Sequence, residues 1–589
     1  MYTELKSYQI IIALLKKYGI KHCVLSAGSR NVPFVHSVEE DPFFECYSVV
    51  DERSAGYFAL GLSQQLQEPV VISCTASTAS CNYWPPVAEA FYQGVPLVIL
   101  TSDRNPAMLG QWEDQMIDQV GMFDRHVKKS VNLPNVENRD DFIHCQRVVN
   151  EALLELDHHG TGPVHINIPM KYYNRSFNCK TLPEVTKIER LDVFSTDDCW
   201  VSKIETLKKC NRILVTCGQS SYVSDAFKET LSQFFHNYNA SISIEYMSNM
   251  NCDGIINSTV CMDSRYLADH HFKELLPEIV ISYGHNITSG IKELLRHFAG
   301  QFEHWLIQED GHIVDMYKSL TTIFECPPLY FFNYCNSHID PCMLNNLHPH
   351  NLLLQHSKRV IIPEFEYSNI YAIKSVVENI PSKSILHLSI NSSIRITNFF
   401  KLQPDVKVYA NIGTYGIDGC LSSFLGQASV LSGLSFLIIG DLSFFYDMNA
   451  LRLRNIDNNV RILMINNHGG EEFYYNKSWI NQSSDLHTTA RHETRAKGWV
   501  LENNFIYLSA TDKKSFDEAL GVFLSEDSEV PIFFEVFTEM KTDADAICNF
   551  YNLSRPKDLR SELVRKGKEF AKSFVGQEKA QKIVNLIKK

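Results

Sequence analysis

Two stretches decide the fold: LSFLIIGDLSFF, residues 434–445, and RILMINNHGG, residues 461–470. Each contains an apolar run of strand length that turns polar at its end, with Asp441 after the first run and Asn467 after the second. Short apolar runs separated by a helical pattern predict neighbouring strands of a parallel α/β sheet. Ligands of such sheets bind at the carboxyl ends of the strands, so we expect Asp441 and Asn467 to share one site.

The residue types at this predicted edge suit a magnesium-bound diphosphate. Carboxylate, amide and backbone carbonyl oxygens are ligands that Mg²⁺ prefers, usually together with phosphate oxygens. Gly440 and the pair Gly469-Gly470 would let the backbone approach a diphosphate closely, and the helix predicted after Asp441 would offer N–H groups to it. Asp, Asn and Gly are also common turn residues, so two unrelated turns are the alternative on spacing alone.

A further carboxylate follows a predicted strand near the N-terminus. The strand Glu45–Val50 runs into Asp51 and Glu52, which precede the helical pattern Ala55–Leu66. Glu52 is therefore predicted at the carboxyl edge of a second sheet. An acidic residue here is also favoured by the helix dipole, so this pattern alone does not define a site.

The composition indicates a multidomain globular protein. The chain has 589 residues, of which 44% are hydrophobic and 21% are charged, with a net charge of −13. This length suggests about three or four domains, and the acidic balance argues against a nucleic-acid-binding protein. We find no membrane-span pattern and no signal peptide, and the 16 cysteines form no CxxC pair. The cysteines are interpreted as free thiols in a reducing compartment, which predicts a cytoplasmic protein.

Alternating strand and helix patterns predict three doubly wound parallel α/β domains. The predicted boundaries are 1–182, 198–357 and 358–554, with a polar linker near 180–198. A basic tail, 555–589, has helical spacing and is interpreted as a solvated helix, with a partner or membrane-surface role as the alternative. The predicted strands are 23–26, 45–50, 70–74, 97–101, 164–168, 212–216, 242–246, 279–283, 305–308, 384–388, 406–410, 435–439, 462–465 and 532–535.

Taken together, these motifs resemble those of the thiamine-diphosphate-dependent enzymes. Gly440-Asp441 and Asn466-Asn467 resemble the cofactor motif, and Glu52 matches the glutamate that activates the cofactor in that family. Four further stretches are similar to the MenD synthases of the menaquinone pathway within this family: SAGSRNVP at 26–33, LTSDRNP at 100–106, GIDG at 416–419 and GDLSFFYDMNAL at 440–451. The similarity covers the first and third predicted domains well and the middle one faintly.

The resemblance implies a fold of pyrimidine, central and diphosphate domains, and at least a homodimer with active sites between subunits. It implies that Glu52 hydrogen-bonds the aminopyrimidine ring and thereby activates the cofactor, which serves as the electron sink. Mg²⁺ would be held by Asp441, Asn467 and the Gly469 carbonyl. Gly440, Leu442, Ser443 and Gly470 would complete the cofactor contacts.

Substrate positions of the MenD synthases can also be carried over. They fall on Arg30, Arg104, Gln115, Lys292, Ser392 and Arg395, the last two after a one-residue gap. Arginine forks suit carboxylates, so such a site would select acidic substrates. Three positions depart from the family: Ile412 replaces an arginine, Asp114 an asparagine and Glu293 a basic residue. Together they make isochorismate, which has two carboxylates, a less favourable acceptor.

We therefore predict thiamine-diphosphate- and Mg²⁺-dependent decarboxylation of a 2-oxo acid, with ligation of the product carbanion to an acceptor. The alternatives are a related ligase with another donor or acceptor, such as pyruvate or a sugar-derived acceptor, a simple decarboxylase, and a cofactor-binding protein without activity. His468 and Glu471 are the nearest candidates for proton transfer. His158-His159 and His270-His271 are interpreted as surface or loop histidines.

Overall fold

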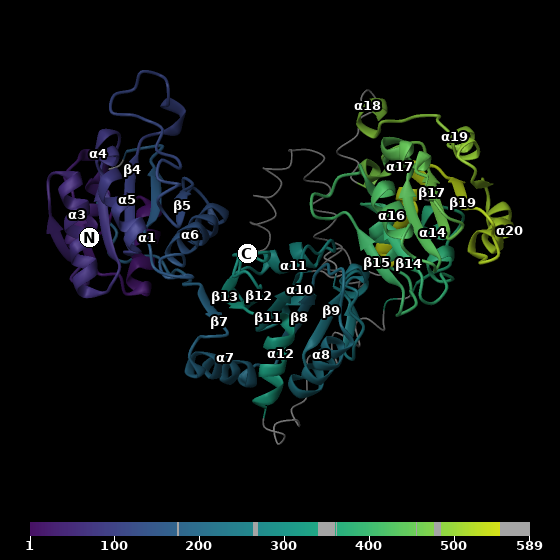
Figure 1. Cartoon of the computed structure of the whole chain (residues 1–589), viewed down its shortest axis with the longest axis horizontal. Coiled ribbons are helices and arrows are strands. Elements are labelled where there is room, and N and C mark those ends of the chain that lie inside the picture. The colour runs from purple at the N-terminus through teal and green to yellow at the C-terminus, as the bar shows by residue number, and fades with distance from the viewer. Residues whose placement is uncertain are drawn as a thin grey trace. The chain divides into compact units, whose positions relative to one another are not determined.

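The computed structural model describes residues 1–173, 176–262, 269–339, 360, 362–454, 456–475 and 485–553. The chain forms two compact units, Met1–Phe194 with Gly311–Glu325, and Ser195–Asp310 with the chain from Cys326 onward. Three parallel α/β sheets confirm the predicted fold class (Figure 1). The predicted tail, 555–589, lies outside the described residues. No helix of the described part is long and apolar enough to cross a membrane.

The first unit contains a six-stranded sheet in the order β2-β1-β3-β4-β6-β5. Its central strands are buried along their whole length, as parallel strands covered on both faces require. Helices α1 and α6 cover one face and α3 and α5 the other (Figure 1). The elements are α1 (Lys6–Tyr18), β1 (His22–Leu25), α2 (Val32–Glu39), β2 (Glu45–Ser48), α3 (Glu52–Leu66), β3 (Val70–Cys74), α4 (Thr78–Asn82), α5 (Trp84–Gln93), β4 (Leu97–Asp103), β5 (Lys129–Asn132), α6 (Arg139–Leu153) and β6 (Val164–Pro169).

The same unit includes a parallel pair of strands far apart in sequence, β7 (Glu189–Asp192) and β13 (Leu320–Glu325). Strand β7 lies inside the polar stretch 180–198 that we predicted as a linker. Two apolar side chains just before it, Val185 and Ile188, are buried. The stretch is therefore packed structure, because its few apolar residues are sufficient to anchor it.

The second unit contains β8 (Ile213–Cys217), β9 (Ser241–Ile244), β10 (Ile255–Asn257), β11 (Ile279–Tyr283) and β12 (Glu303–Ile307) in the order β10-β9-β8-β11-β12. The helices that accompany these strands are α7 (Asp197–Lys209), α8 (Asp225–Tyr238), α9 (Ser258–Cys261), α10 (Asp269–Leu275), α11 (Ile291–His297) and α12 (Pro328–Ser337).

The last sheet has the order β15-β14-β16-β17-β19-β18 and also belongs to the second unit. Its strands are β14 (Ile385–Leu388), β15 (Lys407–Ala410), β16 (Ser435–Gly440), β17 (Val460–Asn466), β18 (Ile506–Ala510) and β19 (Ile532–Phe537). Its helices are α14 (Asn369–Val377), α15 (Ser392–Thr397), α16 (Cys420–Ala428), α17 (Asp441–Asp447), α18 (Asp485–Thr489), α19 (Lys497–Glu502), α20 (Lys513–Leu524) and α21 (Met540–Leu553).

Two amide side chains bind the edge strand β15 of this sheet to the middle sheet. Asn249 donates to the Val408 carbonyl at 2.9 Å and accepts from the Val408 N–H at 2.7 Å. Gln219 donates to the carbonyl of Ala410, the last residue of β15, at 2.7 Å. These bonds satisfy backbone groups that an edge strand otherwise leaves open, and they fix the loop after β15 beside the middle sheet.

Helix α3 approaches α5 closely through Gly56, one turn after Glu52. A Cβ at Gly56 would lie 2.3 Å from Pro86 Cγ, whereas a Cβ at Gly61 of the same helix would meet nothing within 4 Å. Because a packed core tolerates added methyl groups badly, we expect Gly56→Ala to lower the free energy of unfolding by about 1–3 kcal/mol. Thermal and denaturant melts would measure the loss.

Gly61→Ala is the matched control, because it makes the same change in the same helix without a clash. We expect it to raise stability by about 0.5–1 kcal/mol through helix propensity. Equal effects of the two variants would show that the contact between Gly56 and Pro86 does not limit packing.

Candidate functional site

The two polar strand ends meet as the sequence predicts. Asp441 follows β16 and Asn467 follows β17, and these two strands pair in parallel. Both side chains are buried. The Gly469 N–H donates to Asp441 Oδ2 at 3.0 Å, which joins the loop after β17 to the carboxylate. A carboxylate and an amide therefore lie at one sheet edge.

The amide of Asn467 is held in one orientation by two buried acids. Its nitrogen donates to Glu471 Oε2 at 2.8 Å and to Asp543 Oδ2 at 3.1 Å. Because both acceptors contact the nitrogen, Oδ1 points the other way, and it accepts no hydrogen bond from any described residue. An amide oxygen in this setting can serve as a metal ligand.

Glu471 and Asp543 form a buried acidic pair behind this amide. Burial, and then the charge of Asp543, raises the pKa of Glu471, and burial also raises the pKa of Asp543. Asn369 donates to Glu471 at 2.7 Å, and Thr538 donates to Asp543 at 2.5 Å. Both carboxyls are therefore weaker acids than in water, because two adjacent buried carboxylates do not both ionise easily.

The residues fit a magnesium diphosphate. Gly469 has φ +146°, and a Cβ there would lie 2.6 Å from the Thr489 carbonyl oxygen, so this loop position requires glycine. His492 Nε2 lies 3.2 Å from Asp441 Oδ2, and this carboxylate raises the pKa of the imidazole. Asp441 Oδ2 thus faces the His492 imidazole and the Gly469 N–H, and no lysine or arginine of the described chain is bonded to this carboxylate.

Glu52 stands in the first unit as the first residue of α3. Its side chain is half-buried, and no described residue hydrogen-bonds or ion-pairs with its carboxylate. Burial, and then the charge of Glu52, raises the pKa of Cys74, so the carboxylate lies near the carboxyl end of β3. A carboxylate without a partner at a sheet edge fits a group that hydrogen-bonds a ligand from outside the chain.

Two arginine-bearing loops of the first unit occupy the same edge of its sheet. Asn31 donates to the carbonyls of Ser26 at 2.9 Å and Ser73 at 3.0 Å, which fixes the loop that carries Arg30. The Arg30 guanidinium stacks 4.3 Å from the centre of the Tyr173 ring. The loop after β4 places Arg104 in an ion pair with Glu113. The edge thus presents two guanidinium groups next to carboxyl strand ends.

Gln115 is the exception among the predicted site residues of this unit, because its side chain is exposed. Four residues later Gln119 is buried, and its amide bonds to Ser77 N–H at 2.7 Å and to Asn167 Oδ1 at 3.0 Å. Gln119 anchors the loop, and sequence reasoning missed it because glutamine has no distinctive spacing.

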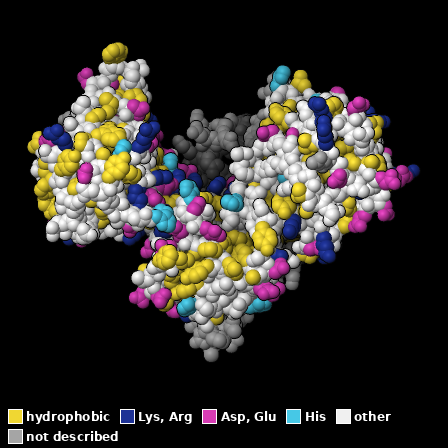
Figure 2. All heavy atoms as spheres, viewed as in Figure 1, with side chains coloured by type: hydrophobic (Ala, Val, Ile, Leu, Met, Phe, Trp, Pro, Cys, Tyr) yellow, Lys and Arg dark blue, Asp and Glu magenta, His cyan; other side chains and the backbone are white. Residues whose placement is uncertain are grey.

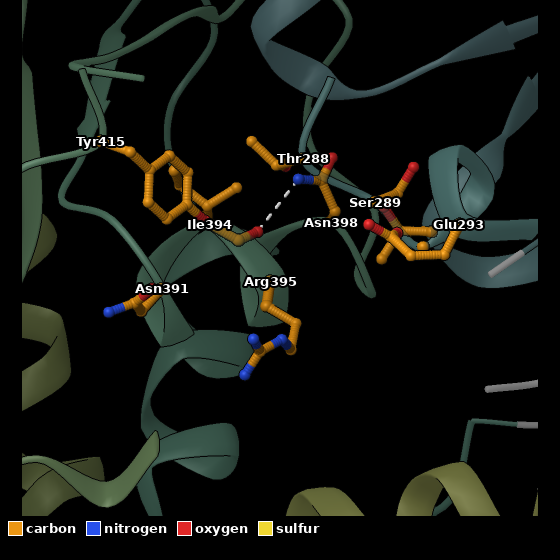
Figure 3. A pocket seen from close by; sticks show the side chains of 10 residues that line it. Thr288, Ser289, Glu293, Asn391, Ile394, Arg395, Asn398 and Tyr415 are labelled. Atoms are coloured by element: carbon orange, nitrogen blue, oxygen red, sulfur yellow. Dashed lines mark hydrogen bonds between the residues drawn. The ribbon is translucent and has the colours of Figure 1, made fainter. Parts of the chain in front are cut away.

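A cavity of about 190 Å³ lies where the middle sheet meets the last sheet in the second unit (Figure 3). Its polar lining residues are Thr259, Thr288, Ser289, Glu293, Asn391, Arg395, Asn398 and Tyr415. Asn391 has φ +63°, a left-handed conformation that non-glycine residues rarely adopt and that often marks functional sites. The cavity therefore brings predicted substrate residue Arg395 together with Glu293, one of the three departures.

Arg395 is already paired within the chain. Its guanidinium forms a two-pronged ion pair with Glu472, at 3.1 and 3.0 Å, and in Figure 3 it points away from Thr288 and Glu293. Ser392 is likewise occupied, because its hydroxyl donates to Glu471. Sequence reasoning missed Glu472, which neutralises the arginine expected to bind an anionic substrate.

Lys292 and Ile412 are connected through Asn286. Lys292 Nζ donates to Asn286 Oδ1 at 2.8 Å, and Asn286 Nδ2 donates to the Ile412 carbonyl at 3.1 Å. Burial lowers the pKa of Lys292. The Ile412 side chain itself is fully buried in the core of the last sheet. An apolar side chain thus occupies this position, and it offers no charge to a substrate.

Comparison with known proteins identifies the family of this chain. Residues 5–122 match the family described as thiamine pyrophosphate enzyme, N-terminal TPP binding domain. A 2-succinyl-5-enolpyruvyl-6-hydroxy-3-cyclohexene-1-carboxylate synthase of Phocaeicola vulgatus is 38% identical over 560 residues, which are 94% of this chain and 99% of that protein. Proteins of the same name from Bacteroides thetaiotaomicron and Flavobacterium psychrophilum are 37% and 31% identical, over 95% and 94% of this chain and 100% and 99% of theirs.

These relatives extend over the middle domain as well as the outer two, where the motif resemblance was strongest. The prediction of a thiamine-diphosphate-binding enzyme that couples decarboxylation to C–C bond formation is thereby confirmed. The chain belongs to the 2-succinyl-5-enolpyruvyl-6-hydroxy-3-cyclohexene-1-carboxylate synthase (MenD) family of thiamine-diphosphate-dependent enzymes.

Proposed function

We propose that this chain catalyses the reaction after which its relatives are named: a 2-oxo acid is decarboxylated, and the remaining succinyl unit is joined to isochorismate. The observation that supports it best is the buried pair of Asp441 and Asn467 at adjacent strand ends, with Asn467 Oδ1 directed away from Glu471 and Asp543. The succinyl part of the relatives' product indicates 2-oxoglutarate as the donor.

Mg²⁺ would be held by Asp441, Asn467 and the Gly469 carbonyl. The diphosphate would lie against Gly440, Leu442, Ser443 and Gly470. When bound, thiamine diphosphate supplies the electron sink for the carbanion left by decarboxylation. Glu52 would hold a proton at the pyrimidine ring nitrogen through its unpartnered carboxylate.

Substrate carboxylates would be bound by the guanidinium groups of Arg30 and Arg104, because planar forks match carboxylate geometry. Gln115, Lys292, Ser392 and Arg395 are the further proposed substrate contacts. Glu471 and Asp543 would keep the Asn467 amide oriented through the two bonds to its nitrogen.

Carbon dioxide release and product analysis test this proposal. The purified chain would receive thiamine diphosphate and Mg²⁺ with 2-oxoglutarate or pyruvate, each with and without isochorismate. We expect release from 2-oxoglutarate and a succinylated isochorismate adduct. Release without that adduct would contradict the proposed acceptor, and release from pyruvate alone would contradict the donor.

Ligation to a less anionic acceptor is the second candidate, and the ion pair between Arg395 and Glu472 favours it. A guanidinium with both prongs on an internal carboxylate has fewer N–H donors to offer to an acceptor, and the carboxylate offsets its charge. Glu293 in the cavity wall and apolar Ile412 also disfavour an anionic acceptor. A neutral, hydroxyl-bearing acceptor would meet Thr288, Ser289 and Asn391 there.

Glu472→Gln separates these two candidates. Removal of the carboxylate frees Arg395, so we expect the KM for isochorismate to fall at least about tenfold, since a charged hydrogen bond contributes about 1.5–3 kcal/mol. Steady-state kinetics with varied isochorismate would measure it. This variant is a sharper test than Ile412→Arg, which would force a guanidinium into the core.

Glu378→Gln is the matched control, because Glu378 pairs with Lys374 at 2.9 Å along α14. We expect it to leave the KM unchanged. An unchanged KM in Glu472→Gln as well would show that the pair does not limit acceptor choice.

We also propose a cytoplasmic homo-oligomer with active sites between subunits. Hydrophobic side chains gather on the surface of the first unit near α3 and α5 (Figures 1 and 2). Tyr57, Phe58, Trp84 and Tyr92 are exposed there. An apolar surface of this kind favours self-association, which sedimentation would measure.

A further inference from the structure

Two adjacent histidines and a buried glutamate meet in the first unit, outside the site described above. His158 and His159 lie in the loop between α6 and β6, at the amino end of β6, and Glu325 is the last residue of β13. His158 Nε2 lies 2.9 Å from Glu325 Oε2, and His159 Nε2 lies 2.7 Å from Glu325 Oε1. The three ligand atoms lie within 4.8 Å of one another.

His158 also has the partner that metal-bound histidines usually have. Its Nδ1 lies 3.1 Å from Glu155 Oε2, and the other oxygen of Glu155 accepts from Arg190 at 3.0 Å. Ligating histidines donate their second ring N–H to a carboxylate in this way. With that proton on Nδ1, a neutral His158 directs the Nε2 lone pair at Glu325, so a proton or a metal ion must lie between them.

The loop backbone holds both rings against one carboxylate. His159 has φ +52°, a left-handed conformation that is uncommon outside glycine. Lys128 Nζ donates to the carbonyls of His158 and Gly160, and the two imidazole rings lie 4.0 Å apart between centres. The side chain of Glu325 is only 8% exposed. This uncommon backbone conformation thus brings a second ring nitrogen to a buried oxygen donor.

The charges around the cluster allow a cation. Lys128 and Arg190 are the neighbouring basic groups; Lys128 is bound to carbonyls, and Arg190 to Glu155 and the Leu154 carbonyl. The carboxylates of Glu155 and Glu325 face the histidines. Two imidazoles and one carboxylate form a donor set that suits Zn²⁺ and related transition metals, whereas Mg²⁺ prefers oxygen donors only.

We propose that His158, His159 and Glu325 bind a divalent transition-metal ion of the Zn²⁺ type, with water as the fourth ligand. The nitrogen ligands of tetrahedral zinc lie about 3.3 Å apart at bond lengths of about 2.0–2.1 Å, so small rotations of the three side chains complete the site. The ion would cross-link the loop before β6 to the end of β13. This connection would be more rigid than an ion pair between histidine and glutamate.

Co²⁺ provides a probe with a readout that does not depend on activity. The holoenzyme, saturated with thiamine diphosphate and Mg²⁺, would be titrated with Co²⁺ while visible absorption is recorded. We expect one equivalent with the intense absorption of four-coordinate Co²⁺, which Zn²⁺ displaces. His159→Ala and Glu325→Gln should each abolish this absorption. Glu325→Gln preserves the size of the side chain and an oxygen acceptor inside the fold, so a loss of absorption in this variant would report loss of the metal ligand and not unfolding.

His236→Ala is the matched control. His236 pairs with Asp253 at 2.8 Å, an exposed histidine–carboxylate contact to which the described residues add no third metal ligand. We expect it to retain the absorption and the stoichiometry. Absence of the four-coordinate signal in the unsubstituted holoenzyme, or the same signal in His159→Ala, would overturn the proposal. Melting curves of each variant without added metal would verify that it is folded.

Discussion

Glu52→Gln is expected to reduce turnover by about 10²–10⁴-fold, the range that a positioned acid or base contributes. The substitution preserves the size of a half-buried side chain that has no partner among the described residues, so the fold should not change. An amide cannot hold the proton at the pyrimidine ring nitrogen as a carboxylate does. Carbon dioxide release under saturating 2-oxo acid would measure the loss.

The readouts that should not change make this test specific. Affinity for thiamine diphosphate and the melting temperature are expected to remain near those of the unsubstituted chain. Glu39→Gln, at the exposed end of α2, removes a carboxylate that likewise has no partner in the described structure, and it should retain full turnover. Normal turnover in Glu52→Gln would remove Glu52 from the chemistry and leave the cofactor to be activated by another group.

Asp441→Ala is expected to weaken Mg²⁺-dependent binding of thiamine diphosphate by at least about 10–100-fold, the loss caused even by removal of a group behind a metal ligand. The variant also leaves the Gly469 N–H without its acceptor and His492 without its carboxylate. Cofactor titrations at limiting and saturating Mg²⁺ would separate the metal contribution from that of the loop.

The pattern across metal concentration decides this second test. A lost ligand should raise the Mg²⁺ requirement, whereas a merely disturbed loop should weaken cofactor binding equally at all Mg²⁺ concentrations. Asp457→Asn, in the exposed loop before β17, is the control. It should change neither the Mg²⁺ requirement nor the affinity for the cofactor. Unchanged cofactor affinity in Asp441→Ala would remove Asp441 from the metal site.

Strands that are buried on both faces were predictable from the sequence. The runs at 70–74 and 279–283 coincide with β3 and β11, because each begins with three consecutive β-branched residues, which favour strands. Strands β5, β7, β10 and β18 were missed, since they are short or carry exposed residues and show no such run. Strand β13 was missed although most of it is buried, because threonines interrupt its apolar run.

The candidate site was predictable where acidic and amide residues directly follow a strand. Asp441, Asn467 and Glu52 could be found in this way, since each follows a recognisable strand. Asp543 could not, because it approaches Asn467 from α21, 76 positions further along the chain. The pairing of Glu472 with Arg395 also depends on tertiary packing, and no spacing rule connects two such residues 77 positions apart.

The return of Gly311–Glu325 to the first unit has a consequence for synthesis and truncation. A ribosome releases β7 long before β13. Strand β7 therefore lacks its partner strand β13 until residue 325 has emerged. A chain cut after residue 194 would lack the paired strand and the Glu325 carboxylate altogether, and would leave an unpaired strand edge prone to aggregation. Expression of the N-terminal unit alone therefore requires both of its segments, joined by a short linker that replaces Ser195–Asp310.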